Sequence, residues 1–516
     1  MTSATDLATW LVDEVIRLGV QHVVLAPGSR SAPLAFVLSQ RAACGDLTLH
    51  TRIDERTAAF LALGMAKVSG RPAVVVTTSG TAVANLHPAM LEAAHAGVPL
   101  IAVTADRPAT LRGTGANQTT DQVGVFGEDV PCVDLAEVPA GPLLCTPDSP
   151  IQINLQFSEP LVPSPSDLSP RASDSSAGVV VEVGPRTVVV AGDDGAEAVA
   201  IAQAGGWPLL AEPTSGARWG AHALRTYRLL LDSPLAAEIE RVIVTGHPTL
   251  SRPVSRLLAH PEVEVISVRA KGRWPRRPFP VAAEADEITI LGAPQGDWLA
   301  RWHEADRERA ARVDHYVGRI QGLAPYAVAA EVAAAVPEGG LLWVGASNPI
   351  RDLDLMMTRT EQPRLVTANR GLAGIDGTLS SAIGAALAIA PTRAIAYLGD
   401  VTFLHDVTAL VRAPWEPEPD LSIVVANDNG GSIFATLEQG APDYAEDFER
   451  LFATPHGVDL AALCASVRVP HWRVESRAEL AHALANPNGG IEVIEAVIPR
   501  ADRRRWDREL RGLGAG

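Results

Sequence analysis

The sequence predicts an α/β protein with three doubly wound parallel-sheet domains, in which two homologous outer domains flank a middle domain. Its 516 residues correspond to about three domains of roughly 150 residues each. Short Val- and Ile-rich runs alternate with Ala-rich stretches, which is the pattern of strands and helices in a parallel sheet. The first and last thirds of the chain also share one order of motifs, which indicates a duplicated fold.

Two changes in composition mark the expected domain boundaries. Residues 157–178 are rich in Pro, Ser and Asp and predict a linker. Residues 298–320 interleave charged and apolar side chains at helical spacing, and predict a connecting amphipathic helix. We therefore expect domains at 1–165, 180–315 and 322–516. The middle domain alternates strand and helix patterns and contains no catalytic constellation.

The outer domains repeat one pattern at an offset of 322 residues. Ile53-Asp54 matches Ile375-Asp376, so that Glu55 corresponds to Gly377, and each motif precedes an Ala- and Leu-rich helix. A buried strand, a polar loop, another helix and another strand follow in both copies. The last strands are expected to end at Asp106 and Asp428, which have the same offset. Generic βα patterning is the alternative explanation of this similarity.

Two polar loops of the last domain predict a metal site. Gly399-Asp400-Val401-Thr402 follows one predicted strand, and Asn427-Asp428-Asn429-Gly430-Gly431 follows the next. Ligands of open α/β sheets bind at the carboxyl ends of the strands. Two carboxylates and the Gly430 carbonyl suit Mg²⁺ or Mn²⁺, with further ligands from a phosphate-bearing cofactor. For either aspartate alone, capping of the following helix explains the residue equally well.

These loops resemble the fingerprint of thiamine-diphosphate enzymes, Gly-Asp-Gly followed by Asn-Asn. The sequence departs from that fingerprint at Val401 and Asp428. Seven segments point to one branch: APGSRSAPL (26–34), HTRIDERTAAFLALGMAK (50–67), TSGTAVANLHPAMLEA (78–93), TADRP (104–108), GANQTT (115–120), ANRGLAGIDGTLSSAIGAAL (368–387) and NDNGGSIF (427–434). With them, both outer domains resemble the MenD family, the 2-succinyl-5-enolpyruvyl-6-hydroxy-3-cyclohexene-1-carboxylate (SEPHCHC) synthases of menaquinone biosynthesis. The middle domain matches only in layout.

The resemblance implies a thiamine-diphosphate-binding fold, with a pyrimidine-binding first domain and a diphosphate-binding last domain. Glu55 would polarise the aminopyrimidine of the cofactor, and Ile433 would hold the cofactor bent. The implied cofactor-binding residues are Glu55, Ser79, Thr81, Ser380, Gly399, Asp400, Val401, Asp428, Gly430, Ile433 and Phe434, with Mg²⁺ or Mn²⁺ at Asp400, Asp428 and Gly430. Without the other motifs, Glu55 would be interpreted as a first-turn helix stabiliser and Ile433 as ordinary core.

Arginines are the candidate substrate ligands. Four of them are expected just past strand ends: Arg30, Arg107, Arg351 and Arg370. In a chain with a net charge of −17, such a group favours carboxylates bound through bidentate contacts. The resemblance implies two diacids, 2-oxoglutarate and isochorismate, bound by Arg30, Arg107, Asn117, Gln118, Ser347, Arg351 and Arg370. Arg252 is a weaker candidate, and His87 and His95 are interpreted as structural.

The implied reaction is decarboxylation of 2-oxoglutarate and Stetter-like 1,4-addition of the succinyl unit to isochorismate, which gives SEPHCHC. The resemblance also implies a homodimer or homotetramer with active sites between subunits. Another thiamine-diphosphate 2-oxo-acid decarboxylase, or an acetolactate synthase, is the alternative, and it would not need the arginines. A non-catalytic nucleotide-binding module is a second alternative, although no GxGxxG or Walker A motif supports it.

Composition limits the remaining possibilities. An acidic chain without a Lys- or Arg-rich run makes a poor nucleic-acid binder. The cysteines lie far apart and predict reduced thiols: Cys44, Cys132, Cys145 and Cys464. The N-terminus lacks the pattern of a signal peptide, and the apolar stretch 377–392 is too short and interrupted for a membrane span. We therefore expect a cytoplasmic protein.

Overall fold

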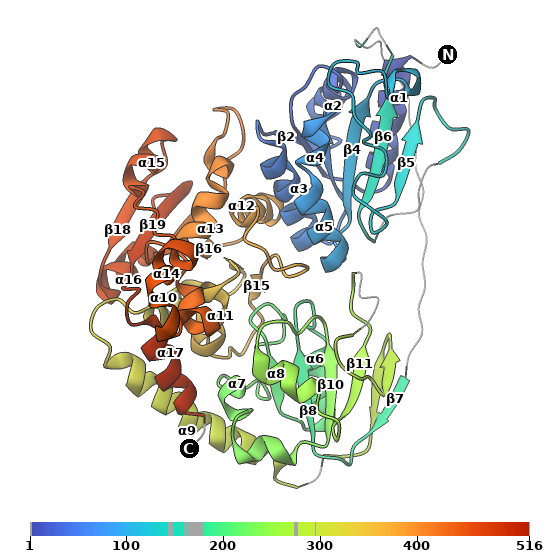
Figure 1. Ribbon diagram of the computed structural model, residues 1–516. Coiled ribbons are helices and arrows are strands. Elements are labelled where there is room, and N and C mark those ends of the chain that lie inside the picture. Colours follow the sequence, from blue (N-terminus) through green and yellow to red (C-terminus); the bar gives the residue numbers. More distant parts are fainter. Residues whose placement is uncertain are drawn as a thin grey trace. The chain divides into compact units, whose positions relative to one another are not determined.

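The computed structural model describes residues 3–142, 148–158, 161, 179–272, 277–294 and 296–514 (Figure 1). The chain forms two compact units. The first comprises Met1–Asp174, Gly371–Ala390 and His405–Pro419, and the second comprises Ser175–Arg370, Pro391–Leu404 and Asp420–Gly516. Most of the predicted linker 157–178 and the thiol of Cys145 lie outside the described residues.

The first unit contains a six-stranded parallel sheet with the order β2-β1-β3-β4-β6-β5. Its strands are β1 (His22–Leu25), β2 (Thr48–Thr51), β3 (Ala73–Thr77), β4 (Leu100–Asp106), β5 (Cys132–Leu135) and β6 (Ile151–Gln156). Its helices are α1 (Ala4–Arg17), α2 (Ala32–Cys44), α3 (Glu55–Ser69), α4 (Thr81–Ala84), α5 (His87–Ala96) and α12 (Thr378–Ile389). Strands β3 and β4 are buried along their whole length, which explains their nearly unbroken apolar sequences.

The second unit contains a sheet of the same design, with the order β15-β14-β16-β17-β19-β18. Its strands are β14 (Leu341–Val344), β15 (Leu365–Thr367), β16 (Ala394–Gly399), β17 (Leu421–Asn427), β18 (His471–Val474) and β19 (Ile491–Val497). The helices around it are α10 (Pro325–Ala335), α11 (Asn348–Met356), α13 (Asp400–His405), α14 (Ala445–Phe448), α15 (Leu460–Ser466), α16 (Arg477–Ala485) and α17 (Arg503–Gly512). Counted along the chain, both sheets have the strand order 2-1-3-4-6-5, which confirms the predicted duplication.

The register of the strands corrects the predicted offset. Ala73 pairs with Leu100 in the first sheet, and Ala394 pairs with Leu421 in the second, so the central strands are related by 321 residues rather than 322. Asp106 therefore corresponds to Asn427, where β17 ends. Asp428 lies one residue beyond the strand, because the loop after β17 starts one position earlier than the sequence pattern suggested.

The second unit also contains the middle sheet, whose five parallel strands have the order β12-β11-β10-β8-β9. They are β8 (Thr187–Ala191), β9 (Leu209–Ala211), β10 (Arg241–Thr245), β11 (Glu264–Val268) and β12 (Ala283–Ala285), while β7 (Val179–Glu182) pairs separately with β13 (Ile288–Leu291). The helices are α6 (Ala198–Gly205), α7 (Tyr227–Leu230), α8 (Arg252–Leu258) and the 21-residue α9 (Trp298–Gly318). The predicted βα alternation and connecting helix are both confirmed.

Buried ion pairs join the elements of the second unit. Arg218 Nη1 lies 2.9 Å from Asp354 Oδ1 on α11, and both side chains are almost completely buried. The hydroxyl of Tyr227 donates to the same carboxylate at 2.8 Å. On α17, Arg503 makes a bidentate contact with Asp352, with a shortest distance of 2.6 Å. Helix α11 is thus held by the middle segment and by α17, in a geometry suited to guanidinium–carboxylate pairs.

In the first unit, α3 and α12 approach closely through one glycine on each helix. A Cβ atom on Gly64 would lie 2.1 Å from the carbonyl oxygen of Ser381, and one on Gly384 would lie 2.1 Å from that of Leu61. The contact is reciprocal: Gly64 corresponds to Gly384 and Leu61 to Ser381, each at an offset of 320 residues, as expected for a pseudo-twofold interface. In these helices Glu55 therefore corresponds to Ile375, and not to Gly377 as predicted.

We expect Gly384→Ala to destabilise the protein by about 1–3 kcal/mol, because the added methyl group would overlap backbone of α3. Gly318→Ala is the matched control, since Gly318 ends α9 and a Cβ there would meet nothing within 4 Å. The control should be neutral or slightly stabilising, as for other exposed helical glycines. Urea unfolding measures both variants, and equal midpoints for the two would contradict the close helix contact.

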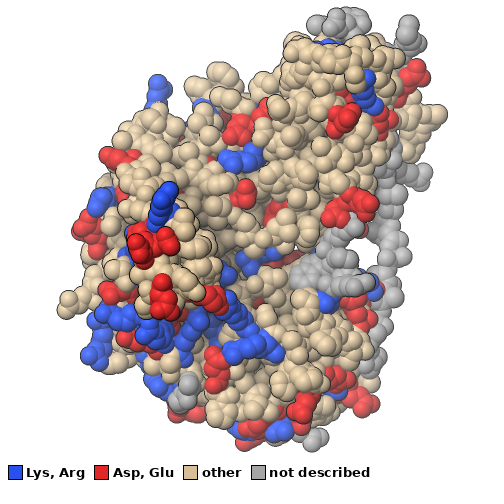
Figure 2. Space-filling model, viewed as in Figure 1, with Lys and Arg blue, Asp and Glu red and all other residues tan. Residues whose placement is uncertain are grey.

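The described part of the chain contains no helix with both the length and the apolar character of a membrane span. Cys44, Cys132 and Cys464 are free thiols. On the face shown in Figure 2, acidic and basic side chains are interspersed, and Lys and Arg gather near α17, whose sequence is RRRWDRELRG. These basic side chains form a local exception on a chain of net charge −17.

Candidate functional site

The carboxyl ends of β16 and β17 place Asp400 and Asp428 in neighbouring loops. The two strands are adjacent and parallel, with Gly399 opposite Ala426. Asp400 starts α13 and is buried, and its Oδ2 accepts the Gly430 N–H at 2.8 Å. The same oxygen lies 3.1 Å from Nε2 of His456, a residue that the sequence analysis did not identify. Asp400 therefore organises the loop that carries Asp428.

The environment of Asp428 fits a cation. Burial, and next the charge of Asp400, raise the pKa of Asp428 to about 7. Its Oδ1 atom is buried and has no hydrogen-bond partner among the described residues, and such an orphaned oxygen is a natural ligand for an ion. No cluster of three or more His, Cys, Asp or Glu suited to a metal occurs among the described residues. A cation here would need further oxygen ligands, as Mg²⁺ usually takes from phosphates.

Gly430 is the third predicted metal ligand, and its backbone requires glycine. Its φ is +141°, and a Cβ would lie 2.1 Å from the Ala453 carbonyl oxygen. The following short helix, Ser432–Thr436, contains Ile433 and Phe434, and both are half-buried. Asn348 Nδ2 donates to Ser432 Oγ at 2.8 Å and connects this helix to the start of α11. Val401 donates its backbone N–H to Asp400 Oδ1 at 2.8 Å.

Helix α11 begins at a strained residue. Ser347 has a φ of +72°, which a residue other than glycine rarely adopts and which is often found at functional sites. Its carbonyl oxygen accepts from Arg351 Nη1 at 2.6 Å, while the Arg351 carbonyl accepts from Arg228 Nη1 at 2.8 Å. We expected Arg351 just past the end of β14. It lies instead within α11, because a loop and the first helical turn intervene. Ser347 and Arg351 are nevertheless brought together.

Arg351 and Arg370 form a pair of neighbouring cations. Burial, followed by the charges of Arg370 and Arg228, lowers the pKa of Arg351. Arg370 follows β15, is only 4% exposed, and donates from Nη2 to Thr249 Oγ1 at 2.7 Å. Its Nε is buried without a hydrogen-bond partner, and neither arginine has an ion pair within the described ranges. Two such cations are costly without a counter-charge, so this site suits an anionic ligand.

In the first unit, Glu55 is the first residue of α3. The helix is capped by its neighbour, because Asp54 Oδ1 accepts the N–H groups of Arg56 at 2.9 Å and Thr57 at 3.2 Å. The Glu55 side chain is half-buried and has no hydrogen-bond partner among the described residues. Asp54 therefore caps the helix, while Glu55 is the acidic residue of its first turn, as in the alternative explanation of Glu55.

A loop after β3 brings Ser79 and Gln118 together. Ser79 is buried, and its Oγ donates to the Gln118 carbonyl oxygen at 2.7 Å. Gln118 Nε2 donates back to the Ser79 carbonyl oxygen at 3.0 Å, and Gln118 has a φ of +57°. Thr81 starts α4 and is exposed, as is Asn117. The predicted Ser79 and Gln118 are thus connected by two hydrogen bonds.

The two predicted arginines of this unit have different surroundings. Arg30 Nη1 donates to the carbonyl oxygen of Phe157 at 3.0 Å. Arg107 directly follows β4 and is half-buried. No sequence pattern indicated Arg112, which lies 2.9 Å from the buried Asp106 and 2.8 Å from Asp134. Arg112 already has two carboxylate partners, so it is a structural residue.

Two other buried acidic residues, Asp406 and Glu92, are identified only by the structure. Asp406 is fully buried and accepts from the Ser380 N–H at 2.6 Å and from Ser380 Oγ at 2.9 Å. Burial raises the pKa of Asp406 to about 6. Glu92 is buried on α5 and accepts the N–H groups of Gly371 and Leu372, each at 2.8 Å. Both carboxylates stabilise segments of the predicted motifs.

Arg252, a weaker substrate candidate, and the two histidines that we interpreted as structural all have partners in the structure. Arg252 pairs with Glu438 at 2.9 Å, and both side chains are about 70% exposed. His95 lies in α5, with Nδ1 2.9 Å from the Leu91 carbonyl oxygen, and His87 packs edge-on against Phe126. These contacts agree with the structural interpretation of both histidines.

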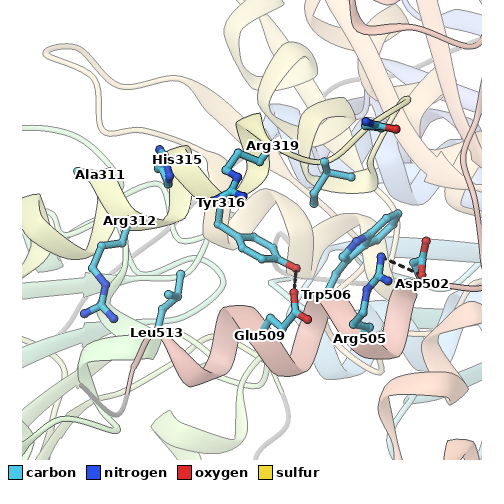
Figure 3. A pocket seen from close by; sticks show the side chains of 12 residues that line it. Ala311, Arg312, His315, Tyr316, Arg319, Asp502, Arg505, Trp506, Glu509 and Leu513 are labelled. Atoms are coloured by element: carbon cyan, nitrogen blue, oxygen red, sulfur yellow. Dashed lines mark hydrogen bonds and ion pairs between the residues drawn. The ribbon is translucent and has the colours of Figure 1, made fainter.

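A cavity of about 970 Å³ lies between α9 and α17 in the second unit and holds none of the predicted site residues. Figure 3 shows Tyr316 pointing from α9 to Glu509 on α17, and Arg505 paired with Asp502. The predicted site residues form two separate groups, one in each unit. The first group contains Glu55, Ser79, Gln118 and Ser380, and the second contains Ser347, Arg351, Arg370, Asp400, Asp428 and Ile433.

Comparisons with known proteins identify the family of the chain. The family "Thiamine pyrophosphate enzyme, N-terminal TPP binding domain" matches residues 5–125, and "Thiamine pyrophosphate enzyme, C-terminal TPP binding domain" matches residues 352–494. A curated protein of a Nocardioides species is 56% identical over 99% of this chain and 98% of its own. A Kineococcus radiotolerans protein is 48% identical over 98% of this chain and 97% of its own length. A Nocardia farcinica protein is 42% identical over 99% of this chain and 99% of its own length. All three are named 2-succinyl-5-enolpyruvyl-6-hydroxy-3-cyclohexene-1-carboxylate synthase.

Proposed function

Because the chain belongs to the family of SEPHCHC synthases, we propose that it decarboxylates 2-oxoglutarate and adds the succinyl unit to isochorismate in a Stetter-like 1,4-addition. The product would be SEPHCHC, an intermediate of menaquinone biosynthesis. The observation that carries the substrate assignment is the pair Arg351 and Arg370, two buried or half-buried cations without an ion pair in the described structure. Diacid substrates supply the carboxylates that such a pair needs.

The cofactor is thiamine diphosphate, and the residues at the strand ends fit it. When bound, it supplies the nucleophilic carbon and accepts the electron pair that decarboxylation releases. Asp400, Asp428 and the Gly430 carbonyl would hold Mg²⁺ or Mn²⁺, and the ion would bind the diphosphate. The orphaned Asp428 oxygen supports this assignment. Gly399, Val401, Ile433 and Phe434 would line the same cofactor site, with Ser79, Thr81 and Ser380 as further candidates.

Glu55 is the proposed acid–base residue. Its carboxylate has no partner among the described residues, and it would hold a proton at the ring nitrogen of the cofactor's aminopyrimidine. The adjacent Asp54 supplies the side-chain cap of the helix, so the Glu55 carboxylate is free of that contact. Other proton transfers would fall to Gln118 or to water.

The remaining polar residues would bind and orient the two substrates. We assign Arg351, Arg370 and Ser347 in the second unit to carboxylate binding, because Ser347 and Arg351 are hydrogen-bonded and the two arginines are neighbours. In the first unit we assign Arg30, Arg107, Asn117 and Gln118 to the same task. Bidentate guanidinium contacts would fix the orientation of each diacid as well as its charge.

The proposed organisation is three domains, at 1–165, 180–315 and 322–516, in a homodimer or homotetramer whose active sites lie between subunits. The resemblance of both outer domains to the family supports this organisation. Light scattering coupled to gel filtration measures the oligomeric state directly.

The substrate assignment is tested by following 2-oxoglutarate consumption with and without isochorismate, in the presence of thiamine diphosphate and Mg²⁺. We expect SEPHCHC to form only when both substrates are present. Pyruvate is the control substrate, because it lacks the second carboxylate that the arginines would bind. Carboligation of pyruvate without any requirement for isochorismate would contradict the proposal and favour the acetolactate synthase alternative.

A further inference from the structure

The carboxyl edge of the middle sheet meets Arg370. Glu212 directly follows β9, and Thr249 lies in the loop after β10, which β8 separates from β9 in the middle sheet. Both residues therefore occupy the edge at which open α/β sheets usually bind ligands. Here that edge contacts an arginine of the proposed substrate site, since Arg370 Nη2 donates to Thr249 Oγ1 at 2.7 Å.

A buried carboxylate supports the loop behind this contact. Glu212 is only 1% exposed. Its Oε1 accepts the Leu250 N–H at 2.9 Å, and its Oε2 is 3.4 Å from the Thr249 nitrogen. The glutamate thus fixes the backbone that presents the Thr249 hydroxyl to Arg370. Removing its hydrogen bonds would free two backbone N–H groups and release the loop.

The electrostatics of Glu212 also involve Arg370. Burial raises the pKa of Glu212 to about 7, and the positive charge of Arg370 is the main influence in the opposite direction. Asp354 also faces Glu212, but Asp354 is already paired with Arg218 at 2.9 Å. Arg370 has no ion pair elsewhere in the described residues. The charge of Arg370 therefore acts on the Glu212 carboxyl, although the two side chains form no ion pair in the described structure.

We propose that Glu212 and Thr249 are positioning residues for substrate binding, through which the middle sheet orients the Arg370 guanidinium toward one carboxylate of a diacid substrate. This inference rests on the proposed function and assigns a role to the middle segment, for which the sequence indicated only the weaker candidate Arg252. The reaction itself would not involve Glu212 or Thr249. Their effect would be confined to the affinity for the substrate that Arg370 binds, because a fixed guanidinium loses less freedom on binding.

Thr249→Val tests this arrangement, since it removes the hydroxyl and keeps the shape of the side chain. Thr249 is exposed, so the variant should fold. We expect the KM for one diacid to rise about tenfold, as for the loss of a hydrogen bond to a charged group. The KM for the other diacid and the kcat should each change less than about threefold. The affinity for thiamine diphosphate should be unchanged. Thr249→Ser should restore the wild-type KM.

Glu212→Gln provides a second measurement, because it removes the charge and keeps an acceptor for the Leu250 N–H. We expect it to raise the KM for the same diacid as Thr249→Val. Glu264→Gln is the matched control. Glu264 starts β11, so it lies at the amino ends of the strands of the same sheet, away from Arg370, and it pairs with Arg241 at 2.6 Å. This control should leave both KM values unchanged.

Two results would overturn the inference. One is a KM within about twofold of wild type for both diacids in both variants. The other is a lower kcat, a higher KM for both diacids and a weaker cofactor affinity, all together and not reversed by Thr249→Ser. That result would indicate a merely structural role. A wild-type enzyme that forms no SEPHCHC would instead contradict the proposed function, so the two failures are distinguishable.

Discussion

Replacing Glu55 by Gln is expected to lower kcat by about 10²- to 10⁴-fold, the usual contribution of a general acid–base residue. Gln keeps the size of the side chain and its hydrogen-bonding capacity, but it cannot hold the proton at the pyrimidine nitrogen. Cofactor binding should persist, since the metal and the diphosphate would be held by residues of the second unit. Isothermal titration with thiamine diphosphate and Mg²⁺ measures binding, and SEPHCHC formation measures activity.

Asp54→Asn is the matched control for Glu55→Gln. It removes a neighbouring negative charge at the same end of α3, while Asn still caps the helix nearly as well as Asp. We expect the control to keep most of the activity. An active Glu55→Gln enzyme that still binds its cofactor would contradict the proposed role of Glu55.

Replacing Asp400 by Ala is expected to abolish metal-dependent retention of thiamine diphosphate. The substitution removes a proposed metal ligand and also the acceptor of the Gly430 N–H, so the loop that carries Asp428 would lose its main support. Even a residue that only supports a metal ligand typically contributes 10- to 100-fold to metal affinity, so we expect a loss of more than about 100-fold. Cofactor retained after gel filtration with and without Mg²⁺ is the readout.

Two further variants sharpen the Asp400 experiment. Asp400→Asn keeps an acceptor for the Gly430 N–H and removes only the charge, so it should fold and still lose the metal dependence. Asp420→Asn is the control, because Asp420 precedes β17 at the other end of the strand and accepts the Gly490 N–H at 2.6 Å. Unchanged cofactor retention in Asp400→Ala would remove Asp400 from the metal site.

The fold could be predicted because its signals are local. Strands buried on both faces are continuous apolar runs, as β3 and β4 are, and polar residues at their ends stand out. The duplication preserved the spacing of these signals closely enough to be recognised. Asp400 and Asp428 could be placed in neighbouring loops because adjacent parallel strands end at the same edge of a sheet.

Contacts between distant residues could not be predicted in this way. Thr249 and Arg370 are 121 residues apart in the sequence, and no local sequence pattern predicts their hydrogen bond. The contact of His456 with Asp400 and the hydrogen bond from the Gly371 N–H to Glu92 could not be predicted for the same reason. Arg351 was placed at a strand end because the start of a helix after a tight turn resembles a loop in sequence. Each of these features depends on packing that only the folded chain defines.

The contact between α3 and α12 limits how this protein can be dissected. A fragment covering residues 1–165 would contain α3 without the helix that meets Gly64 in the folded first unit. Phe60 and Leu61, both almost fully buried, belong to the stretch of α3 that contacts α12. Uncovered apolar surface of this kind promotes aggregation. A soluble excised fragment would therefore need residues 371–390 supplied as well, either through a grafted linker or as a separate peptide.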